Sequence, residues 1–268
     1  MKIRLMGTGA AEGIPAFWAD TFVSNYARKH RGKDVRTRSA ALIDDCLKID
    51  LGPDTLMQTH RDELDPCLWT AVFFTHSDDD HFAPAELQYG LFPFNNRENL
   101  SYTIFGNGSI CDTLKARYPQ WPMEIVRTTS FRPVKHGRYC ITPIKARHKP
   151  EEDSHNFIFD DGEKTLLYAT DTGIWEAETW ALLESVRLDG LILECTEGIS
   201  GTGYDGHLDL NEFESVIERL RTMETVGPKT TICTTHHSHN GGATHAMLEE
   251  RLNPQGVLVG YDGLVLEI

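Results

Sequence analysis

The sequence is poor in basic residues relative to acidic ones, and it has no long hydrophobic run. Its 26 lysines and arginines stand against 40 aspartates and glutamates, giving a formal net charge of −14. A nucleic-acid surface needs a field of Lys and Arg, so no interface with long nucleic acid is expected. No apolar run reaches the ~18 residues of a membrane span, and the first residues lack a signal peptide's apolar stretch. We therefore predict a cytoplasmic protein with no membrane partner.

The sequence also lacks any Cys-x-x-Cys pair, although it contains six cysteines. Their scattered positions argue against a disulfide framework or a zinc ribbon. Cys195 and Cys233 end apolar runs, so we expect them to pack as small hydrophobic side chains.

Strand-like runs and helical stretches alternate along the chain, with no linker or low-complexity segment between them. This pattern predicts one α/β layered domain over residues 1–268. A turn is expected at 7–9 and a polar, Arg-rich stretch at 28–38. Strands are expected at 2–6, 39–43, 47–50, 71–74, 102–105, 141–146, 156–159, 165–169, 191–194, 230–234, 257–259 and 264–268, and helices at 84–90, 210–222 and 244–252.

The strongest local signal is the segment His76-x-Asp78-x-Asp80-His81, which directly follows a buried strand. Four potential ligands in six residues can serve both ions of a metal pair. Asp80 could also cap the helix expected at 84–90. An acidic, solvated helix start is the simpler interpretation of this segment taken alone. A calcium-binding EF-hand is excluded, because the central glycine and the glutamate spacing are missing.

Three further candidate ligands, His148, Asp171 and His236, each follow an expected strand. Any one of them alone is more often structural, but together they favour a site for divalent metals with open coordination positions. His207 directly precedes the helix expected at 210–222. It is either a helix-flanking residue or a general acid, since the ordinary pKa of histidine lies near neutral pH.

A family resemblance rests on motifs spread along nearly the whole chain. They are Gly7-Thr8-Gly9 with Gly13-Ile14-Pro15, the 76–81 block, Tyr168-Ala-Thr-Asp171-Thr-Gly, Gly206-His207-Leu, Thr235-His236-x-x-His239 and Gly260-Tyr-Asp-Gly263. In this order they resemble the PhnP-type phosphodiesterases of the metallo-β-lactamase superfamily, which are similar to RNase Z and PqqB-like proteins. The resemblance implies a four-layer αβ/βα sandwich, with the metals at the edge between its two sheets.

The resemblance also implies roles for individual residues. One metal is expected on His76, Asp78 and His148, and the other on Asp80, His81 and His236, with Asp171 bridging them. His207 matches the histidine that assists the leaving group, so the implied catalytic residues are His207, Asp80 and Asp171. His239 and Thr172 are expected to contact the substrate or to support the ligands.

The sequence departs from the family pattern in two places. The usual motif is His-x-His-x-Asp-His, and Asp78 stands at its second histidine. A carboxylate is a harder ligand than imidazole, which should move the preference from zinc alone toward Mn²⁺ or Fe. The segment 17–28 lacks the cysteine cluster that holds an extra zinc in many PhnP-type proteins, so no structural metal is expected.

The expected function is hydrolysis of a small cyclic or nucleotide-like phosphodiester. Two divalent ions, Mn²⁺ or Zn²⁺ with Fe possible, would lie about 3.5–4 Å apart and share the attacking hydroxide. The alternatives are an RNase Z-like enzyme, a lactonase or a thioesterase of the same fold, or a non-catalytic metal- or ligand-binding protein. RNase Z needs a basic arm, and the only basic stretch here, 28–36, is short. A homodimer remains an open possibility.

Overall fold

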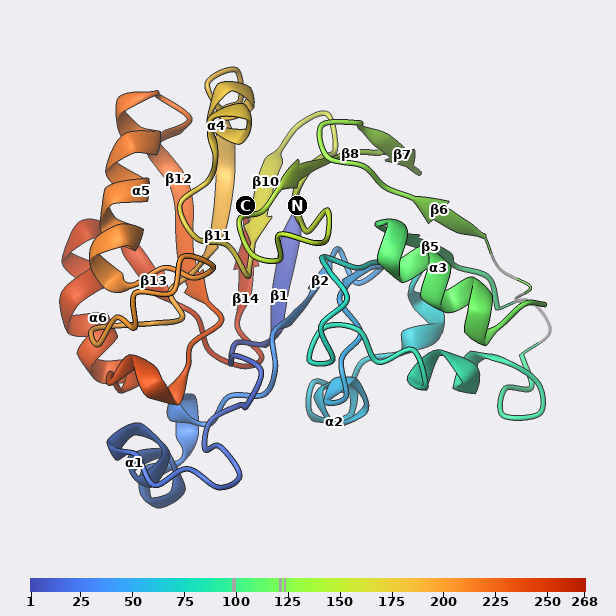
Figure 1. Ribbon diagram of the computed structural model, residues 1–268, viewed down its shortest axis with the longest axis horizontal. Coiled ribbons are helices and arrows are strands. Elements are labelled where there is room, and N and C mark those ends of the chain that lie inside the picture. The colour runs from blue at the N-terminus through green and yellow to red at the C-terminus, as the bar shows by residue number, and fades with distance from the viewer. Residues whose placement is uncertain (98–99, 121, 123) are drawn as a thin grey trace.

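Two seven-stranded sheets form the centre of the computed structural model, which describes residues 1–97, 100–120, 122 and 124–268 (Figure 1). The first sheet has the order β14 (Val265–Glu267), β1 (Lys2–Gly7), β2 (Ala40–Ile43), β3 (Leu47–Ile49), β4 (Ala71–Phe73), β5 (Thr103–Gly106), β6 (Ile125–Arg127). The second has the order β13 (Val257–Val259), β12 (Val226–Thr235), β11 (Leu188–Glu194), β10 (Thr165–Ala169), β9 (His155–Asp160), β8 (Tyr139–Lys145), β7 (Val134–His136).

Helices cover the outer faces of both sheets. The α-helices are α1 (Phe22–His30), α2 (Thr55–Arg61), α3 (Gly108–Arg117), α4 (Ala177–Leu183), α5 (Leu210–Thr222) and α6 (His245–Leu252). Short 3₁₀ helices occupy Gly32–Asp34, Pro66–Leu68, Glu86–Gly90, His239–Gly241 and Asn253–Gln255. In Figure 1, α5 and α6 lie on the left beside the second sheet, α3 lies on the right beside the first, and α2 lies at the lower centre. No helix in the described part of the chain is long and apolar enough to cross a membrane.

Strand residues alternate between two cores, which is why the strands appear as continuous apolar runs in the sequence. In β2, Ala41 and Ile43 belong to the core between the sheets, whereas Ala40 and Leu42 pack in the outer core of the first sheet. Successive strand side chains point to opposite faces, so a strand buried on both sides needs apolar residues throughout. A third core joins the outer face of the second sheet to α4, α5 and α6. The predicted four-layer sandwich is confirmed.

The helix expected at 210–222 is present with the same bounds. Asp209 accepts a hydrogen bond from the backbone N–H of Glu212, and the Glu212 carboxylate accepts one from the N–H of Asp209. This reciprocal capping satisfies two N–H groups that the helix itself leaves without partners. Phe213, Val216 and Leu220 then place its apolar side against the second sheet. The helix expected at 244–252 is α6, with Thr244 as its N-cap.

Several local predictions are wrong. Residues 84–90 contain only the 3₁₀ helix Glu86–Gly90, because a single residue there, Leu87, is buried and cannot anchor a longer helix. Asp80 does not cap that helix, whose N-cap is Ala85. Helix α1 was not predicted; it buries only Val23, Ser24 and Ala27, and its end lies in the polar stretch at 28–38. Helices α2, α3 and α4 and strands β6 and β7 also lie outside the predicted elements.

The two cysteines expected in the core, Cys195 and Cys233, are completely buried among apolar side chains, as predicted. All six cysteines are free.

Candidate metal centre

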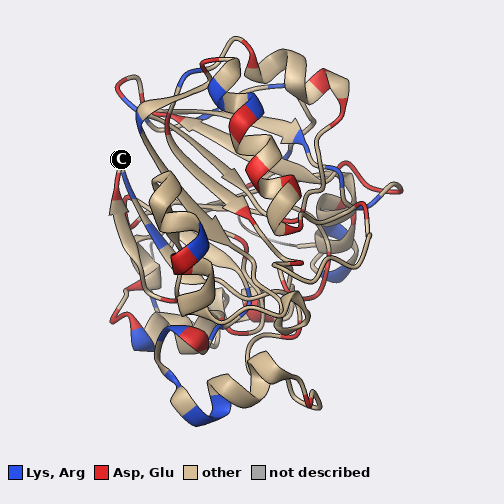
Figure 2. Ribbon diagram, turned by 90° about the vertical axis from the view of Figure 1, so that its left-hand side faces the viewer, with Lys and Arg blue, Asp and Glu red and all other residues tan. Residues whose placement is uncertain are grey.

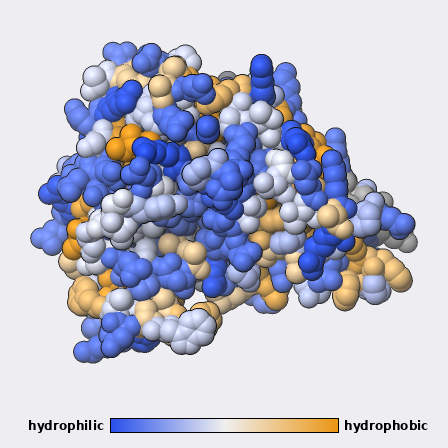
Figure 3. Space-filling model, viewed as in Figure 1, coloured by the Kyte–Doolittle hydropathy of each residue, from blue (hydrophilic) through white to orange (hydrophobic). Residues whose placement is uncertain are grey.

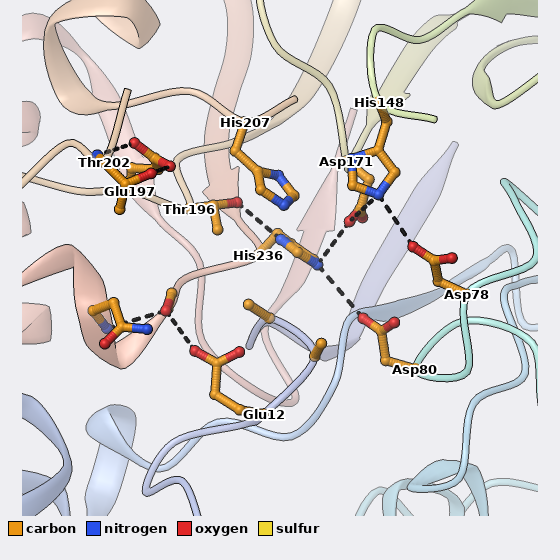
Figure 4. Close-up of a pocket in the computed structure, with 14 residues that line it drawn as sticks. Glu12, Asp78, Asp80, His148, Asp171, Thr196, Glu197, Thr202, His207 and His236 are labelled. Atoms are coloured by element: carbon orange, nitrogen blue, oxygen red, sulfur yellow. Dashed lines mark hydrogen bonds and ion pairs between the residues drawn. The ribbon is translucent and has the colours of Figure 1, made fainter. Parts of the chain in front are cut away.

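The predicted ligands lie in loops that leave the carboxyl ends of strands in both sheets. His76, Asp78, Asp80 and His81 follow β4, whereas His148 follows β8, Asp171 follows β10 and His236 follows β12. Strands β3 to β6 run parallel, as do β10 to β13, so each set ends at one edge of its sheet. The structure brings the side chains of all seven residues together at that edge, between the two sheets. Figure 4 shows five of them, Asp78, Asp80, His148, Asp171 and His236.

One group of side chains comprises His76, Asp78 and His148. The Asp78 Oδ2 atom lies 3.4 Å from the Nε2 atom of His76 and 3.2 Å from that of His148. These atoms face one another across a gap of the size that a single ion fills, because divalent metals bind imidazole nitrogen and carboxylate oxygen at about 2.0–2.2 Å.

A second group comprises Asp80, His81 and His236. The Asp80 Oδ2 atom lies 3.0 Å from the Nε2 atom of His81 and 3.8 Å from that of His236. His81 is completely buried and Asp80 nearly so.

Asp171 lies between the two groups. Its Oδ1 atom is 3.9 Å from the Nε2 atom of His148 and 3.2 Å from that of His236, whereas its Oδ2 atom is 3.1 Å from that of His81. Asp171 and His236 both have positive φ, at 50° and 56°, an uncommon conformation for residues other than glycine. The chain thus adopts strained turns at the two positions that aim these side chains inward.

The chemistry of the donors fits a metal. The Nε2 atoms of His76, His81 and His236 are buried and make no hydrogen bond to the described residues, although carboxylate oxygens surround them. Buried polar atoms without partners are rare, because each loses its hydrogen bonds to water. Three such nitrogens directed at carboxylates form a donor set that two divalent cations would satisfy.

The carboxylates are held in the ionised form that metal binding requires. The hydrogen-bond contact with His148 and the adjacent His76 ring lower the pKa of Asp78 far below its ordinary value. Burial raises the pKa of Asp80, but the charge of His81 and the nearby His236 ring lower it by a larger amount. Burial likewise raises the pKa of Asp171, and the charges of His236 and His81 outweigh that effect. The centre therefore offers three negative charges at neutral pH.

The remaining ring nitrogen of each histidine has a partner that fixes the orientation of the ring. The Nδ1 atom of His76 lies 3.0 Å from Thr75 Oγ1, and that of His236 lies 2.9 Å from Thr196 Oγ1. The Nδ1 atom of His148 is 3.3 Å from the carbonyl oxygen of Gly206. Partners of this kind commonly set the tautomer of metal-binding histidines.

Asp50 orients the fourth histidine and was not among the predicted site residues. Its Oδ2 atom lies 2.7 Å from His81 Nδ1, and its carboxylate also accepts hydrogen bonds from the N–H and hydroxyl groups of Thr75. Asp50 is completely buried at the end of β3. The signal in the sequence was the same as for Asp171, a carboxylate at the end of an apolar strand.

Glu194 holds His207 and was also missed. The Glu194 Oε1 atom lies 2.8 Å from His207 Nδ1, and the carboxylate is completely buried at the end of β11. Burial lowers the pKa of His207, but the charge and hydrogen bond of Glu194 have the larger effect and raise this pKa to about 9. The His207 ring stacks against His236 with ring centroids 5.4 Å apart, so it lies beside one of the predicted metal ligands.

A pocket with a cavity volume of about 230 Å³ opens above these side chains. Asp78, Asp80, His148, Asp171, His207 and His236 line one part of it, and the rest is lined by Ala10, Ala11, Glu12, Thr196, Glu197, Thr202, Ser238 and Asn240. His239 and Thr172 are not among the lining residues. The Nδ1 atom of His239 lies 3.0 Å from Thr21 Oγ1, and Thr172 donates its backbone N–H to Glu194.

Comparisons with known proteins identify the family of the chain. Residues 47–237 match the model of the β-lactamase superfamily domain. The chain therefore belongs to the β-lactamase superfamily, as predicted from its motifs. No curated protein sequence matches the chain at a significant level.

Solved structures show the same fold at low sequence identity. A diphosphatase of the PhnP family is 21% identical, with 100% of this chain and 97% of that chain covered and a TM-score of 0.79. Zn²⁺-bound PqqB from Methylobacterium extorquens is 16% identical, with 100% of both chains covered and a TM-score of 0.79. The short form of human tRNase Z is 16% identical, with 100% of this chain and 99% of that chain covered and a TM-score of 0.69.

Proposed function

We propose that the chain, as one domain over residues 1–268, is a metal-dependent hydrolase of small cyclic or nucleotide-like phosphodiesters. The observation that carries the proposal is Asp171, whose two oxygens face histidines of both ligand groups. One carboxylate placed between two such groups is suited to bridging a pair of cations. The similar diphosphatase of the PhnP family supports phosphoric esters and anhydrides as the substrate class.

The proposed division of labour follows from the positions of the side chains. Two bound divalent ions would lower the pKa of water to about 7 and stabilise negative charge on phosphate oxygens. His76, Asp78 and His148 would hold one ion, Asp80, His81 and His236 the other, and Asp171 both. His207 lines the pocket and is bound through Nδ1 to Glu194, which leaves Nε2 to donate a proton to the leaving oxygen. General-acid assistance of this kind typically contributes about 10²–10⁴ in rate.

The ligand set supports Mn²⁺ or Zn²⁺, with Fe as a third candidate. Three carboxylates and four imidazoles give a harder site than one built mainly from histidine, which favours Mn²⁺ and Fe. The Zn²⁺ in the similar PqqB structure supports zinc.

A small substrate is supported by the size of the pocket and by the state of the basic residues near the N-terminus. The helix α1 projects at the bottom of Figures 1 and 2, where it carries Lys and Arg. Several basic side chains of this region already interact within the protein and are less available to bind a tRNA. Arg36 is buried, and Arg28 donates hydrogen bonds to the carbonyl oxygens of Ala16 and Ala19. Lys33 pairs with Glu249 at 3.1 Å. The face in Figure 3 is mostly hydrophilic, with hydrophobic side chains in small separate groups.

The test is a substrate panel on protein stripped with a chelator and reloaded with Mn²⁺ or Zn²⁺. Bis(p-nitrophenyl) phosphate and a 2′,3′-cyclic nucleotide represent the proposed class, and a lactone, a thioester and a precursor tRNA represent the alternatives. We expect turnover of the diesters only after reloading. Metal-independent turnover, or turnover confined to the lactone, thioester or tRNA, would overturn the proposal. Metal binding without turnover of any substrate would favour a binding protein.

A further inference from the structure

Asp78, the residue that departs from the family motif, has a cationic partner. Its Oδ2 atom faces the ligands His76 and His148, whereas its Oδ1 atom accepts a hydrogen bond from the Lys149 ammonium at 2.6 Å. The two oxygens of this carboxylate therefore have different environments, one directed at the centre and one at a lysine. Figure 4 shows Asp78 turned toward His148 across the pocket.

We propose that Lys149 is a positioning residue that makes Asp78 act as a neutral, one-oxygen ligand in place of the histidine of the family motif. The inference rests on the proposed metal site. A carboxylate would add a full negative charge where the family has a neutral imidazole, and the ammonium at hydrogen-bond distance cancels it. With Oδ1 engaged, only Oδ2 is left to bind an ion.

The lysine is itself held in place. Its Nζ atom lies 3.1 Å from Glu152 Oε2 and 3.2 Å from Ser77 Oγ. Glu152 is nearly buried and accepts a hydrogen bond from Asn107 Nδ2 at 2.6 Å, and Asn107 is the N-cap of α3. A chain of contacts thus runs from the start of α3 through Glu152 to Lys149 and Asp78. An ion pair fixed at both ends loses less side-chain entropy than an isolated surface pair, so it can control geometry.

Lys149 is next to a predicted metal ligand in the sequence. It directly follows His148, so one short loop after β8 delivers both a predicted ligand and the counter-ion of another ligand. Lys145, at the end of β8, provides a comparison because it has the same charge but pairs with Glu176 at 3.9 Å.

The expected consequence concerns metal selectivity. Zinc prefers four ligands in a tetrahedral arrangement, whereas Mn²⁺ accepts six, mostly oxygen. If Lys149 is replaced by methionine, both Asp78 oxygens become available and the local negative charge rises. Lys149→Met should therefore favour Mn²⁺, so that the Kd for Zn²⁺ divided by the Kd for Mn²⁺ rises by about tenfold. Changes of this size are typical for residues that support metal ligands.

The experiment measures both Kd values by competition with a chromophoric chelator, and the number of bound ions by elemental analysis. The matched control is Lys145→Met, which removes the same charge without touching Asp78 and should leave the ratio nearly unchanged. Glu152→Gln releases the lysine without removing it and should give a smaller shift in the same direction. Equal ratios in wild type, Lys149→Met and Lys145→Met would overturn the inference.

A reciprocal test restores the family motif. Asp78→His leaves the Lys149 ammonium beside a neutral ring and a bound cation, so affinity for both metals should fall by about tenfold. Adding Lys149→Met should recover it. An Asp78→His protein that binds metal as tightly as wild type, with no response to Lys149→Met, would contradict the role of the lysine. Wild-type protein that binds neither metal would instead refute the proposed function.

Discussion

The Oε1 atom of Glu194 lies 2.8 Å from the Nδ1 atom of His207, and this contact joins the interior of the second sheet to the pocket. The same carboxylate accepts hydrogen bonds from the backbone N–H groups of Thr172, Thr196 and Leu208. It also accepts one from the hydroxyl of Thr196, which in turn lies 2.9 Å from His236 Nδ1. Glu194 therefore orients the proposed general acid directly and one predicted metal ligand through Thr196.

His207→Ala should lower kcat by about 10²–10⁴, because the leaving oxygen loses its proton donor. The loss should be larger for a diester with an alkyl leaving group than for bis(p-nitrophenyl) phosphate, whose p-nitrophenolate leaves without a proton. Steady-state kinetics with both substrates would check this. Elemental analysis is the control, since the variant should keep the metal content of wild type. Equal losses on the two substrates, or loss of metal, would show that His207 is not the acid.

Glu194→Gln should lower kcat on the order of a hundredfold, by releasing the proton donor that it orients. The amide oxygen can still accept hydrogen bonds, but the NH₂ group faces donors that need an acceptor, so the His207 ring should lose its fixed orientation. KM should change little, because Glu194 does not line the pocket.

The control for this variant is Glu176→Gln, which makes the same chemical change at the exposed start of α4. It should leave kcat as in wild type. A Glu194→Gln enzyme with full kcat and normal metal content would refute the orienting role of the carboxylate.

Asp171→Asn should remove most of the bound metal, because the neutral amide is a poor bridge between two cations. We expect activity to fall by at least about a hundredfold. Elemental analysis after gel filtration measures the metal content. The control is Asp189→Asn, since Asp189 lies at the far end of β11 and pairs with Lys164 at 2.9 Å. If Asp171→Asn retained its full metal content, the bridge would lie elsewhere.

The sequence predicts those strands and helices whose burial produces a regular pattern of apolar residues. Strands such as β4 and β10 are covered on both faces, so they appear as apolar runs that stop at a polar ligand. Helix α5 was predictable because one full side of it is buried. Helix α1 buries little and α2 is only two turns long, so their positions depend on tertiary contacts that a periodic pattern does not encode.

In the candidate site, the sequence likewise predicts some residues and misses others. The seven predicted ligands are histidines and aspartates at strand ends, and the structure brings their side chains together, although metal binding itself stays a prediction. The sequence marks Asp50 as a carboxylate at a strand end, as it does Asp171. The supporting roles of Asp50, Glu194 and Lys149 were still missed, because they depend on which side chain each one contacts, and the sequence does not show this. Their roles follow only from distances such as the 2.7 Å between Asp50 and His81.

Lys48→Met should change how the free energy of unfolding depends on pH. Lys48 is completely buried, and its ammonium donates to the carbonyl oxygens of Ile49 and Asp50. Burial lowers the pKa of Lys48 to about 7, although the charge of Asp50 opposes this effect. Between pH 7 and the ordinary lysine pKa near 10.4, the unfolded chain therefore binds a proton that the folded protein does not.

The sign follows from this difference in bound protons. Stability contributed by this group rises with pH in that window, by up to about 1.4 kcal/mol per pH unit. The variant lacks the group, so the unfolding free energy of wild type should gain on that of Lys48→Met as pH rises from 7 to 9. Urea titrations of chelator-treated protein at several pH values measure the difference. Lys145→Met, at an exposed lysine, should keep the slope of wild type, and a slope retained in Lys48→Met would mean that the buried amine does not titrate there.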